Sequence, residues 1–305
     1  MPGSRASLLC ALAILSAAFA LLWGKRLRAD ARKSAGSHPG RVIRRPTSAE
    51  CAIGFATDFL DTLGIGSFAV TTSLYKLLHL VPDEDIPGTL NVGHAIPTFI
   101  EAFIFIAVVA VEGRTLALMI AAAVVGSWFG AGMVTSWPRR KIQIGMGAAL
   151  LTAAIFFVMK NLGWFPPGGD ALALGGGKLA VGLAGNFIFG ALMPLGIGAY
   201  APCMILTSLL GMNPQAAFPI MMGSCAFLMP VASVRFVRQE RYSVGPALGL
   251  TLGGAPAVLI AAYIVKSLPL TALRWLIIGV VLYTAATMLH SAFRPRASWY
   301  NKKHD

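Results

Sequence analysis

The chain has 305 residues, of which 56% are hydrophobic and only 12% are charged, and its mean hydropathy is +0.72. Soluble domains carry about 25% charged residues. The composition therefore excludes a disordered chain, a secreted disulfide scaffold and almost any soluble enzyme, and it predicts a polytopic helical membrane protein. The net charge is +13, but the basic residues gather at the ends of apolar runs. This placement is typical of membrane topology and not of a nucleic-acid-binding face.

The first apolar run covers residues 7–23 and is about long enough to cross a bilayer. Arg5 precedes it, whereas eight basic residues follow between Lys25 and Arg45. By the positive-inside rule we expect an uncleaved anchor helix with its N-terminus outside, although a signal peptide is the alternative. Residues 1–49 thus form an anchor and a basic cytoplasmic segment.

Eight further apolar stretches follow, at about 51–80, 88–111, 114–136, 141–159, 179–212, 216–234, 244–265 and 271–290. The first and the fifth of these are too long for one ordinary span, and each contains glycines near its middle. We expect each to be a hairpin of two short helices. An arm of about 15 residues is roughly 22 Å long, short of the roughly 30 Å hydrocarbon core.

The chain repeats itself at an offset of 132 residues without a gap. Leu-Gly-Ile-Gly at residues 63–66 recurs at 195–198, and Pro82 and Pro87 match Pro214 and Pro219. The same offset continues to Thr-Ala-Ala at 152–154, which recurs at 284–286. The protein is therefore expected to contain two copies of one membrane unit, as secondary transporters commonly do.

The charges predict that the two copies are inverted. If residues 51–80 form a hairpin with both ends inside, Arg139, Arg140 and Lys141 fall inside, and 19 of the 25 basic residues are cytoplasmic. A single long span would place the same three residues outside, against the positive-inside rule. The predicted fold is an all-α polytopic membrane protein with an N-terminal anchor helix and two inverted repeats. Each repeat has a glycine-broken re-entrant hairpin plus three transmembrane helices.

The predicted boundaries follow from this topology. Repeat 1 covers residues 50–160, an extracytoplasmic linker covers 161–178, repeat 2 covers 179–290, and a basic cytoplasmic tail covers 291–305. Broken backbone at membrane depth is tolerated where protein buries it or water lines it. Two broken segments at equivalent places in inverted halves indicate a transport site.

The hairpins also carry a family resemblance. Gly54-Phe55 with Leu63 to Ser67, and Gly190 with Leu195 to Gly198, resemble the glycine-rich hairpins that open the two halves of TauE/SafE permeases. The resemblance covers roughly residues 50–290. It implies transport of a small anion or an organosulfur acid, such as sulfite or a sulfonate.

The two turns are the expected substrate site. A half-helix that begins after each turn presents free backbone N–H groups and a positive dipole end, and hydroxyl groups add uncharged donors. The alternative is that small residues here only allow close helix packing. The candidate substrate-binding residues are Gly64, Gly66, Ser67, Thr71, Asn91, Gly196, Gly198 and Cys203.

Asp58, Asp61 and Glu101 are the only acidic residues well inside apolar segments. A carboxylate at the bilayer centre costs roughly 2.5–3.5 kcal/mol on insertion scales, so a functional role is the default hypothesis. Asp58 and Asp61 share a helix face. Together with His94, the three acids are expected to couple transport to protons. A cation site, or a buried polar group satisfied by its neighbours, is the alternative.

The leading hypothesis is a secondary transporter of a small anion in the cell membrane, with the basic N-terminal segment and the C-terminus cytoplasmic. We expect no cofactor, no bound metal, no enzymatic activity and no nucleic-acid partner; the partners are the small anionic substrate and the lipid bilayer. A cation or metal carrier using the three acids is the first alternative, and an intramembrane hydrolase with Ser67 and His94 is the second. A homo-oligomer, the direction of transport and the coupling ion stay open. The methionines are expected to be packing residues, and the four cysteines are expected to be buried small side chains without a redox or metal role.

Overall fold

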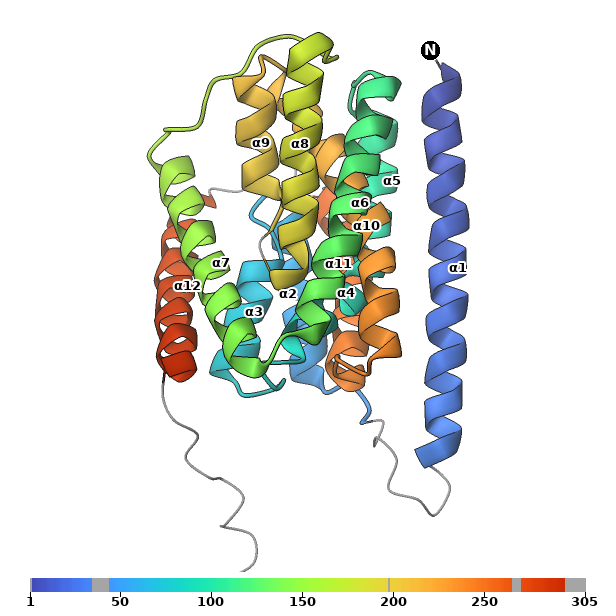
Figure 1. Ribbon diagram of the computed structural model, residues 1–305, viewed down its shortest axis with the longest axis vertical. Helices are drawn as coiled ribbons and strands as arrows, with labels where there is room; N and C mark the ends of the chain where they lie inside the picture. The colour runs from blue at the N-terminus through green and yellow to red at the C-terminus, as the bar shows by residue number, and fades with distance from the viewer. Residues whose placement is uncertain (1, 35–43, 197, 265–269, 294–305) are drawn as a thin grey trace, which may run out of the picture.

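The computed structural model describes residues 2–34, 44–196, 198–264 and 270–293, and across these ranges it contains twelve α-helices and no β-strand (Figure 1). The helices are α1 (Pro2–Ser34), α2 (Ser48–Thr62), α3 (Phe68–Leu77), α4 (Ile86–Gly93), α5 (Ala95–Val108), α6 (Gly113–Ser136), α7 (Arg139–Asn161), α8 (Gly176–Leu192), α9 (Tyr200–Leu209), α10 (Ala217–Arg238), α11 (Val244–Ile264) and α12 (Leu270–Phe293). The all-helical prediction is confirmed. Most of the basic segment from residue 35 and the tail from residue 294 lie outside the described residues.

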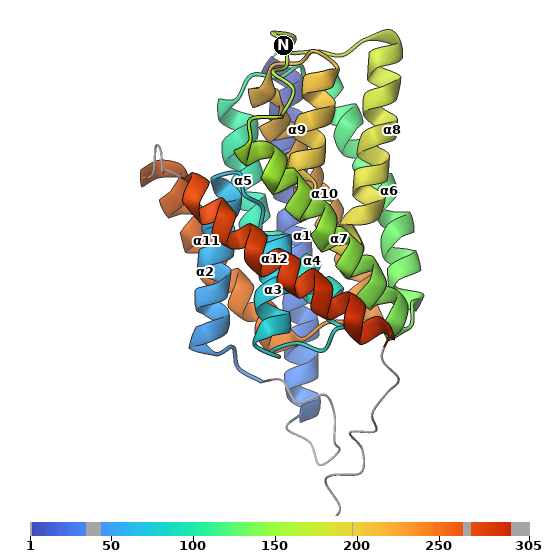
Figure 2. The same ribbon diagram turned by 90° about the vertical axis from the view of Figure 1, so that its left-hand side faces the viewer.

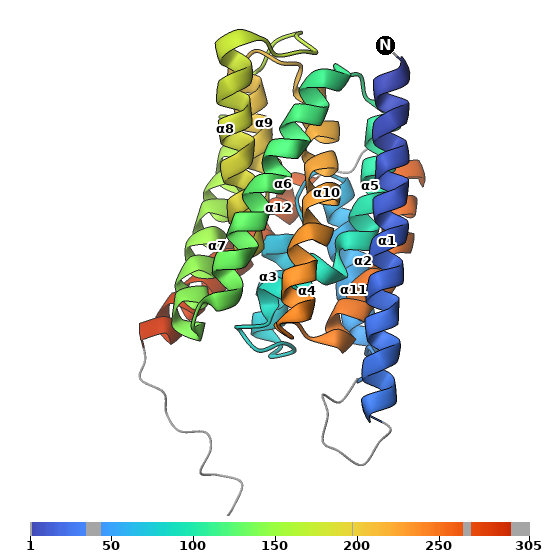
Figure 3. The same cartoon turned by 45° about the vertical axis from the view of Figure 1, so that its right-hand side comes forward.

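Among the described residues, six stretches are long and apolar enough to cross a membrane: Arg5–Ala29, Gly113–Ser136, Arg139–Asn161, Gly176–Leu195, Pro214–Arg238 and Val244–Tyr263. The pair α4 and α5 adds a seventh if it is one span bent by 45°. These lengths indicate a multi-pass membrane protein. The anchor α1 runs along the edge of the bundle beside α5 and α10 (Figure 3).

The first hairpin is formed by α2 and α3. Helix α2 begins with a capping box, in which Thr47 and Glu50 each accept a hydrogen bond from the other's backbone. Gly64 and Gly66 in the turn have φ values of 81° and 94°, a region that side chains with a Cβ rarely adopt. The turn therefore requires glycine at both positions.

The second hairpin is formed by α8 and α9, with a short 3₁₀ helix, Met193–Leu195, between them. Gly196 in this turn has a φ of 95°. Helix α8 and the 3₁₀ helix together form a 20-residue apolar stretch, longer than the arm of about 15 residues that the sequence predicts. In Figure 1 this hairpin occupies the upper half of the molecule, whereas α2 and α3 occupy the lower half.

Helix boundaries follow the 132-residue offset. The ten residues of α3, 68–77, correspond to the ten residues of α9, 200–209. Likewise α6 corresponds to α11 and α7 to α12, each to within about four residues at either end. The bent pair α4 and α5 corresponds to the single helix α10.

The break between α4 and α5 has an identifiable cause. Pro97 has no N–H to donate to the carbonyl of Gly93, one turn earlier. Thr251 Oγ1 of α11 donates to that carbonyl instead, at 2.7 Å. The bend of 45° places His94 at the junction of the two helices.

Close glycine contacts join the two halves of the chain. Helix α2 packs most extensively on α11, where a Cβ on Gly253 would overlap the carbonyl oxygen of Cys51. Helix α8 packs most extensively on α6, where a Cβ on Gly190 would overlap the carbonyl oxygen of Ala123. Helix α12 lies across α7 (Figure 2). Small residues allow such close approach in the absence of a hydrophobic driving force.

Candidate functional site

A small cavity lies where the two hairpin turns meet. Gly66 and Ser67 from the first turn, and Gly198 and Ala199 from the second, contribute to its lining. Its volume, counted as the space open to the centre of a water molecule, is about 20 Å³. This is room for a water molecule, since one needs roughly 10–15 Å³ by this measure, but not for an oxyanion with three or four oxygens. The cavity in this structure is thus smaller than such an oxyanion.

The polar side of the cavity comes from the first half of the chain. Asp61 of α2 lines it and accepts a hydrogen bond from Ser67 Oγ at 2.6 Å. Thr98 of α5 lines it as well. Ser67 is the N-cap residue of α3, yet its side chain makes no capping hydrogen bond, because it is directed to Asp61.

His94 connects two helices behind the cavity. Its Nδ1 lies 2.7 Å from Asp58 Oδ1 and its Nε2 lies 3.0 Å from Thr71 Oγ1. All three residues are fully buried. The His94 ring also packs against Phe68, which lines the cavity, with ring centroids 5.7 Å apart. A movement of the His94 or Asp58 side chain can therefore be transmitted to the cavity through the ring of Phe68.

Glu101 completes the group of buried acids. Thr62 Oγ1 donates to Glu101 Oε1 at 2.8 Å and also contacts the carbonyl oxygen of Asp58 at 2.9 Å. Asp58 Oδ2 and Glu101 Oε2 have no hydrogen-bond partner among the described residues. Thr62 thus links Glu101 to the segment that carries Asp58 and Asp61.

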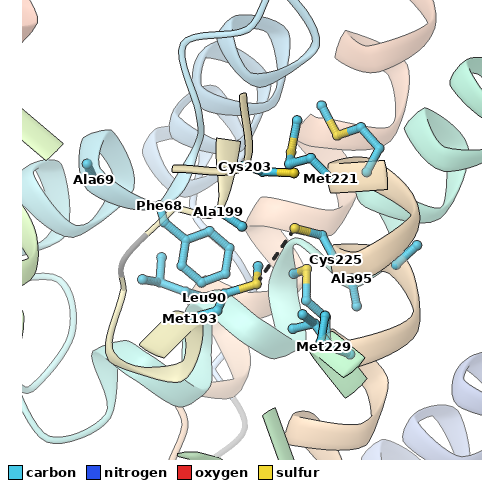
Figure 4. Close-up of a cluster of buried hydrophobic side chains, with 14 of the residues drawn as sticks. Phe68, Ala69, Leu90, Ala95, Met193, Ala199, Cys203, Met221, Cys225 and Met229 are labelled. Carbon is cyan, nitrogen blue, oxygen red and sulfur yellow. Dashed lines mark hydrogen bonds between the residues drawn. The ribbon is translucent and has the colours of Figure 1, made fainter. Parts of the chain in front are cut away.

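The opposite side of the cavity is lined by sulfur. Met193, Met221, Met222, Cys225 and Met229 form this side, and Cys225 Sγ lies 3.7 Å from Met193 Sδ (Figure 4). Sequence reasoning treated these residues as packing and missed this lining. The repeat offset contains the signal, because Met193 is the counterpart of Asp61.

The two halves are chemically different at equivalent positions. The counterparts of Asp58, Asp61, Ser67, Thr71, His94 and Glu101 are Gly190, Met193, Ala199, Cys203, Ala226 and Ser233. Every titratable group of the buried acid cluster therefore belongs to the first half. The second half supplies small, apolar and sulfur-containing residues, and one hydroxyl, in the same places.

The other predicted substrate residues lie at different distances from the cavity. Thr71 contacts His94 and is not part of the cavity lining, and Gly64 and Gly196 serve the backbone of the turns. Asn91 donates to the carbonyl oxygen of Pro87 at 2.8 Å, within its own helix. Cys203 is buried on α9, and Figure 4 draws it beside Met221.

Two features near the turns, a pair of helix dipoles and a lysine, carry positive charge that would attract an anionic ligand. Helices α3 and α9 both begin at the cavity, so their positive dipole ends face it. In addition, Lys160 Nζ at the end of α7 donates to the carbonyl oxygen of Gly64 at 3.0 Å. Sequence reasoning assigned Lys160 no role, because Lys160 is far from the hairpin along the chain.

The two alternative chemistries receive no support from the geometry. Within the part of the chain that the structure describes, no three His, Cys, Asp or Glu residues form a group that could hold a metal ion. Asp58, Asp61 and Glu101 therefore do not converge as metal ligands. Ser67 bonds to Asp61 and not to His94, so the pair that a hydrolase would need is not formed.

A charged cluster holds the loop between α3 and α4. Asp83 accepts hydrogen bonds from Lys76 at 2.7 Å, from Gln143 at 2.7 Å and from Arg139 at 3.1 Å. Burial raises the pKa of Asp83, but these donors outweigh it, and the pKa lies below its ordinary value. The cluster fastens the end of the first hairpin to the start of α7.

Comparisons with known proteins give one match. The sequence model described as "Sulfite exporter TauE/SafE" matches residues 1–157, just over half of the 305-residue chain. The match includes the anchor helix, which the motifs alone did not cover, and ends near the end of the first repeat. The curated proteins and the solved structures give no significant match. The chain therefore belongs to the TauE/SafE sulfite exporter family, whose members are membrane transporters of sulfite-like anions.

Proposed function

We propose that the protein is a secondary transporter of a small sulfur oxyanion or organosulfur acid, such as sulfite or a sulfonate, coupled to protons. The observation that carries this proposal is the cavity at the two hairpin turns, where the N-terminal ends of α3 and α9 meet the hydroxyl groups of Ser67 and Thr98. Backbone N–H groups, a positive dipole and hydroxyl donors suit an oxyanion.

The transporter is built from two inverted repeats, residues 50–160 and 179–290. Three observations support this arrangement: the helix boundaries match at one offset, the two hairpins occupy opposite halves of the bundle, and the α2–α11 interface has its counterpart in α8–α6 (Figure 1). If the two halves exchange conformations, the cavity opens alternately to the two sides of the membrane. The cavity as it stands is too small for the substrate, so transport requires the two halves to move apart around it.

Protons resolve an electrostatic conflict in the cavity. An ionised Asp61 would repel an incoming anion at close range in a medium of low dielectric constant. A proton on Asp61 removes that repulsion and supplies a further donor. Asp58, which contacts His94, is on the same helix as Asp61, and Thr62 links Glu101 to that helix; we expect the proton to arrive through these groups.

Flux measurements in proteoliposomes test the proposal. We expect an inward pH gradient to drive accumulation of sulfite by the wild-type protein. Asp61→Asn should abolish this accumulation while sulfite exchange without a gradient continues. The matched control is Asp170→Asn, the same substitution at an exposed carboxylate in the linker, which should behave as wild type.

Two results would contradict the proposal. Proton-driven accumulation that survives Asp61→Asn would remove the coupling role of Asp61. Thermal stabilisation of the purified protein by divalent metals alone, and not by sulfite, sulfonates or sulfate, would overturn the anion assignment.

Labelling of single cysteines tests the inverted topology. Ser136 and Asp170 are both exposed, near opposite ends of α7. In a background in which all four native cysteines are replaced, Ser136→Cys should react with a membrane-impermeant thiol reagent from the cytoplasmic side and Asp170→Cys from the other side. Labelling of Ser136→Cys from the outer side would refute the inverted arrangement, and labelling of both variants from the same side would show that α7 does not span the membrane.

A further inference from the structure

A second, larger pocket lies between the anchor helix α1 and α10, away from the cavity at the hairpin turns. Its volume, counted in the same way, is about 220 Å³. Phe19, Leu22 and Trp23 line it from α1, and Ser233 and Val237 line it from α10. Leu22 is 61% exposed on a helix that the composition places in the bilayer, so the pocket opens towards lipid.

Two buried hydrogen-bond donors lie in the walls of this pocket without a partner. Trp23 is only 5% exposed, and its indole Nε1 has no hydrogen-bond partner among the described residues. Ser233 is fully buried on the facing helix, and its Oγ is unpartnered in the same described set. Buried indole N–H and hydroxyl groups nearly always find an acceptor. The pocket therefore lacks an acceptor that a ligand would provide.

The same pocket is positively charged at one end. Arg26 of α1 and Arg238 of α10 both line it, at the end of the bundle where α1 and α10 finish (Figure 3). Arg26 also bonds to Glu240, with 2.6 Å between Nη2 and Oε1. With Glu240 included, these three side chains still leave a net positive charge. This is the end at which the basic N-terminal segment begins.

We propose that this pocket binds one anionic phospholipid. The phosphate group contacts Arg26 and Arg238, the ester and phosphate oxygens accept from Trp23 and Ser233, and an acyl chain lies against the apolar residues of α1. Basic pockets between transmembrane helices on the cytoplasmic side are suited to anionic headgroups. The lipid would join α1 to the bundle. Helix α1 packs on the bundle less extensively than the other long helices pack on one another.

Thermal unfolding of the purified full-length chain, with short-chain phosphatidylglycerol or phosphatidylcholine of the same acyl length, tests this proposal. We expect phosphatidylglycerol to raise the unfolding temperature saturably and phosphatidylcholine to raise it less. Arg238→Gln should weaken the apparent affinity for phosphatidylglycerol about fivefold, the factor that corresponds to about 1 kcal/mol per basic residue near an anionic surface. Trp23→Phe, which removes only the N–H donor and part of the ring, should weaken it as well.

The control is Arg28→Gln, at an exposed arginine on the same helix that does not line the pocket. It should leave the affinity for phosphatidylglycerol unchanged. Three results would overturn the proposal: an equal effect of phosphatidylcholine, an equal effect of inorganic phosphate, or an equal loss in Arg28→Gln. The last would indicate attraction to the basic surface in general.

Discussion

Alanine at Gly254 tests how tightly the second half of the chain confines the buried acids of the first. Gly254 is on α11, and a Cβ there would overlap Asp58 Oδ2 and lie 2.7 Å from both Asp58 Cγ and Pro97 Cγ. The substitution therefore forces the Asp58 carboxylate to move. Since Asp58 Oδ1 is 2.7 Å from His94 Nδ1, that movement disturbs this contact directly.

A second glycine makes the magnitude measurable. Gly279 is exposed on α12, and a Cβ there would meet nothing within 4 Å. Both substitutions gain roughly 0.5–1 kcal/mol because alanine is the better helix former, and this gain cancels in the comparison. What remains is the overpacking at Gly254, typically about 1–3 kcal/mol. We therefore expect the free energy of unfolding of Gly254→Ala to be lower than that of Gly279→Ala by about that amount.

Reversible unfolding in mixed micelles measures this difference, and sulfite flux in proteoliposomes measures its functional consequence. Gly279→Ala should transport as wild type, whereas Gly254→Ala should lose proton-driven transport even at temperatures where it is fully folded. Equal stability and equal flux in the two variants would refute the reasoning. It would mean that α2 and α11 can separate at no cost and that the position of Asp58 is unimportant.

Three further outcomes are expected. Gly66→Ala should destabilise the protein and Gly279→Ala should not, because a Cβ meets nothing within 4 Å at either position, but Gly66 has a positive φ of 94° whereas Gly279 lies inside helix α12; equal melting temperatures would contradict this. Asp83→Asn should lower stability at pH 7: the pKa of Asp83 is depressed in the folded protein, so its ion pairs stabilise the fold above about pH 4 and are lost as the pH falls through the folded-state pKa. Acid unfolding curves should therefore converge for the variant and the wild type at low pH. Lys160→Gln should raise the KM for sulfite roughly fivefold, as expected for the loss of about 1 kcal/mol of electrostatic attraction, and should affect the maximal rate less. An unchanged KM would show that the Lys160 ammonium beside Gly64 does not attract the substrate.

Much of the fold follows from residue patterns that act locally. Glycines mark both hairpin turns, and positive φ values at Gly64, Gly66 and Gly196 show why the backbone needs them there. Pro97 marks the break between α4 and α5, since its missing N–H frees the Gly93 carbonyl. Such features depend on one residue and its immediate neighbours along the chain, so the sequence states them directly.

The partners in the site were harder to predict. Sequence reasoning selected Asp58, Asp61 and His94 because polar groups in apolar segments are conspicuous. It did not pair His94 with Asp58, because a distance of 36 positions along the chain gives no information about a contact across two helices. The methionine side of the cavity stayed hidden for a different reason: methionine fills cores so commonly that its presence distinguishes nothing without coordinates.

The interlocked packing of the two halves has a consequence for how such a protein can be divided. Helix α2 has its most extensive interface with α11 of the other half, and α8 has its most extensive interface with α6 of the first half. A fragment ending after α7 would leave Asp58 exposed to lipid on the side that α11 covers, so neither half should insert stably by itself. Two such fragments expressed together should instead find each other and assemble.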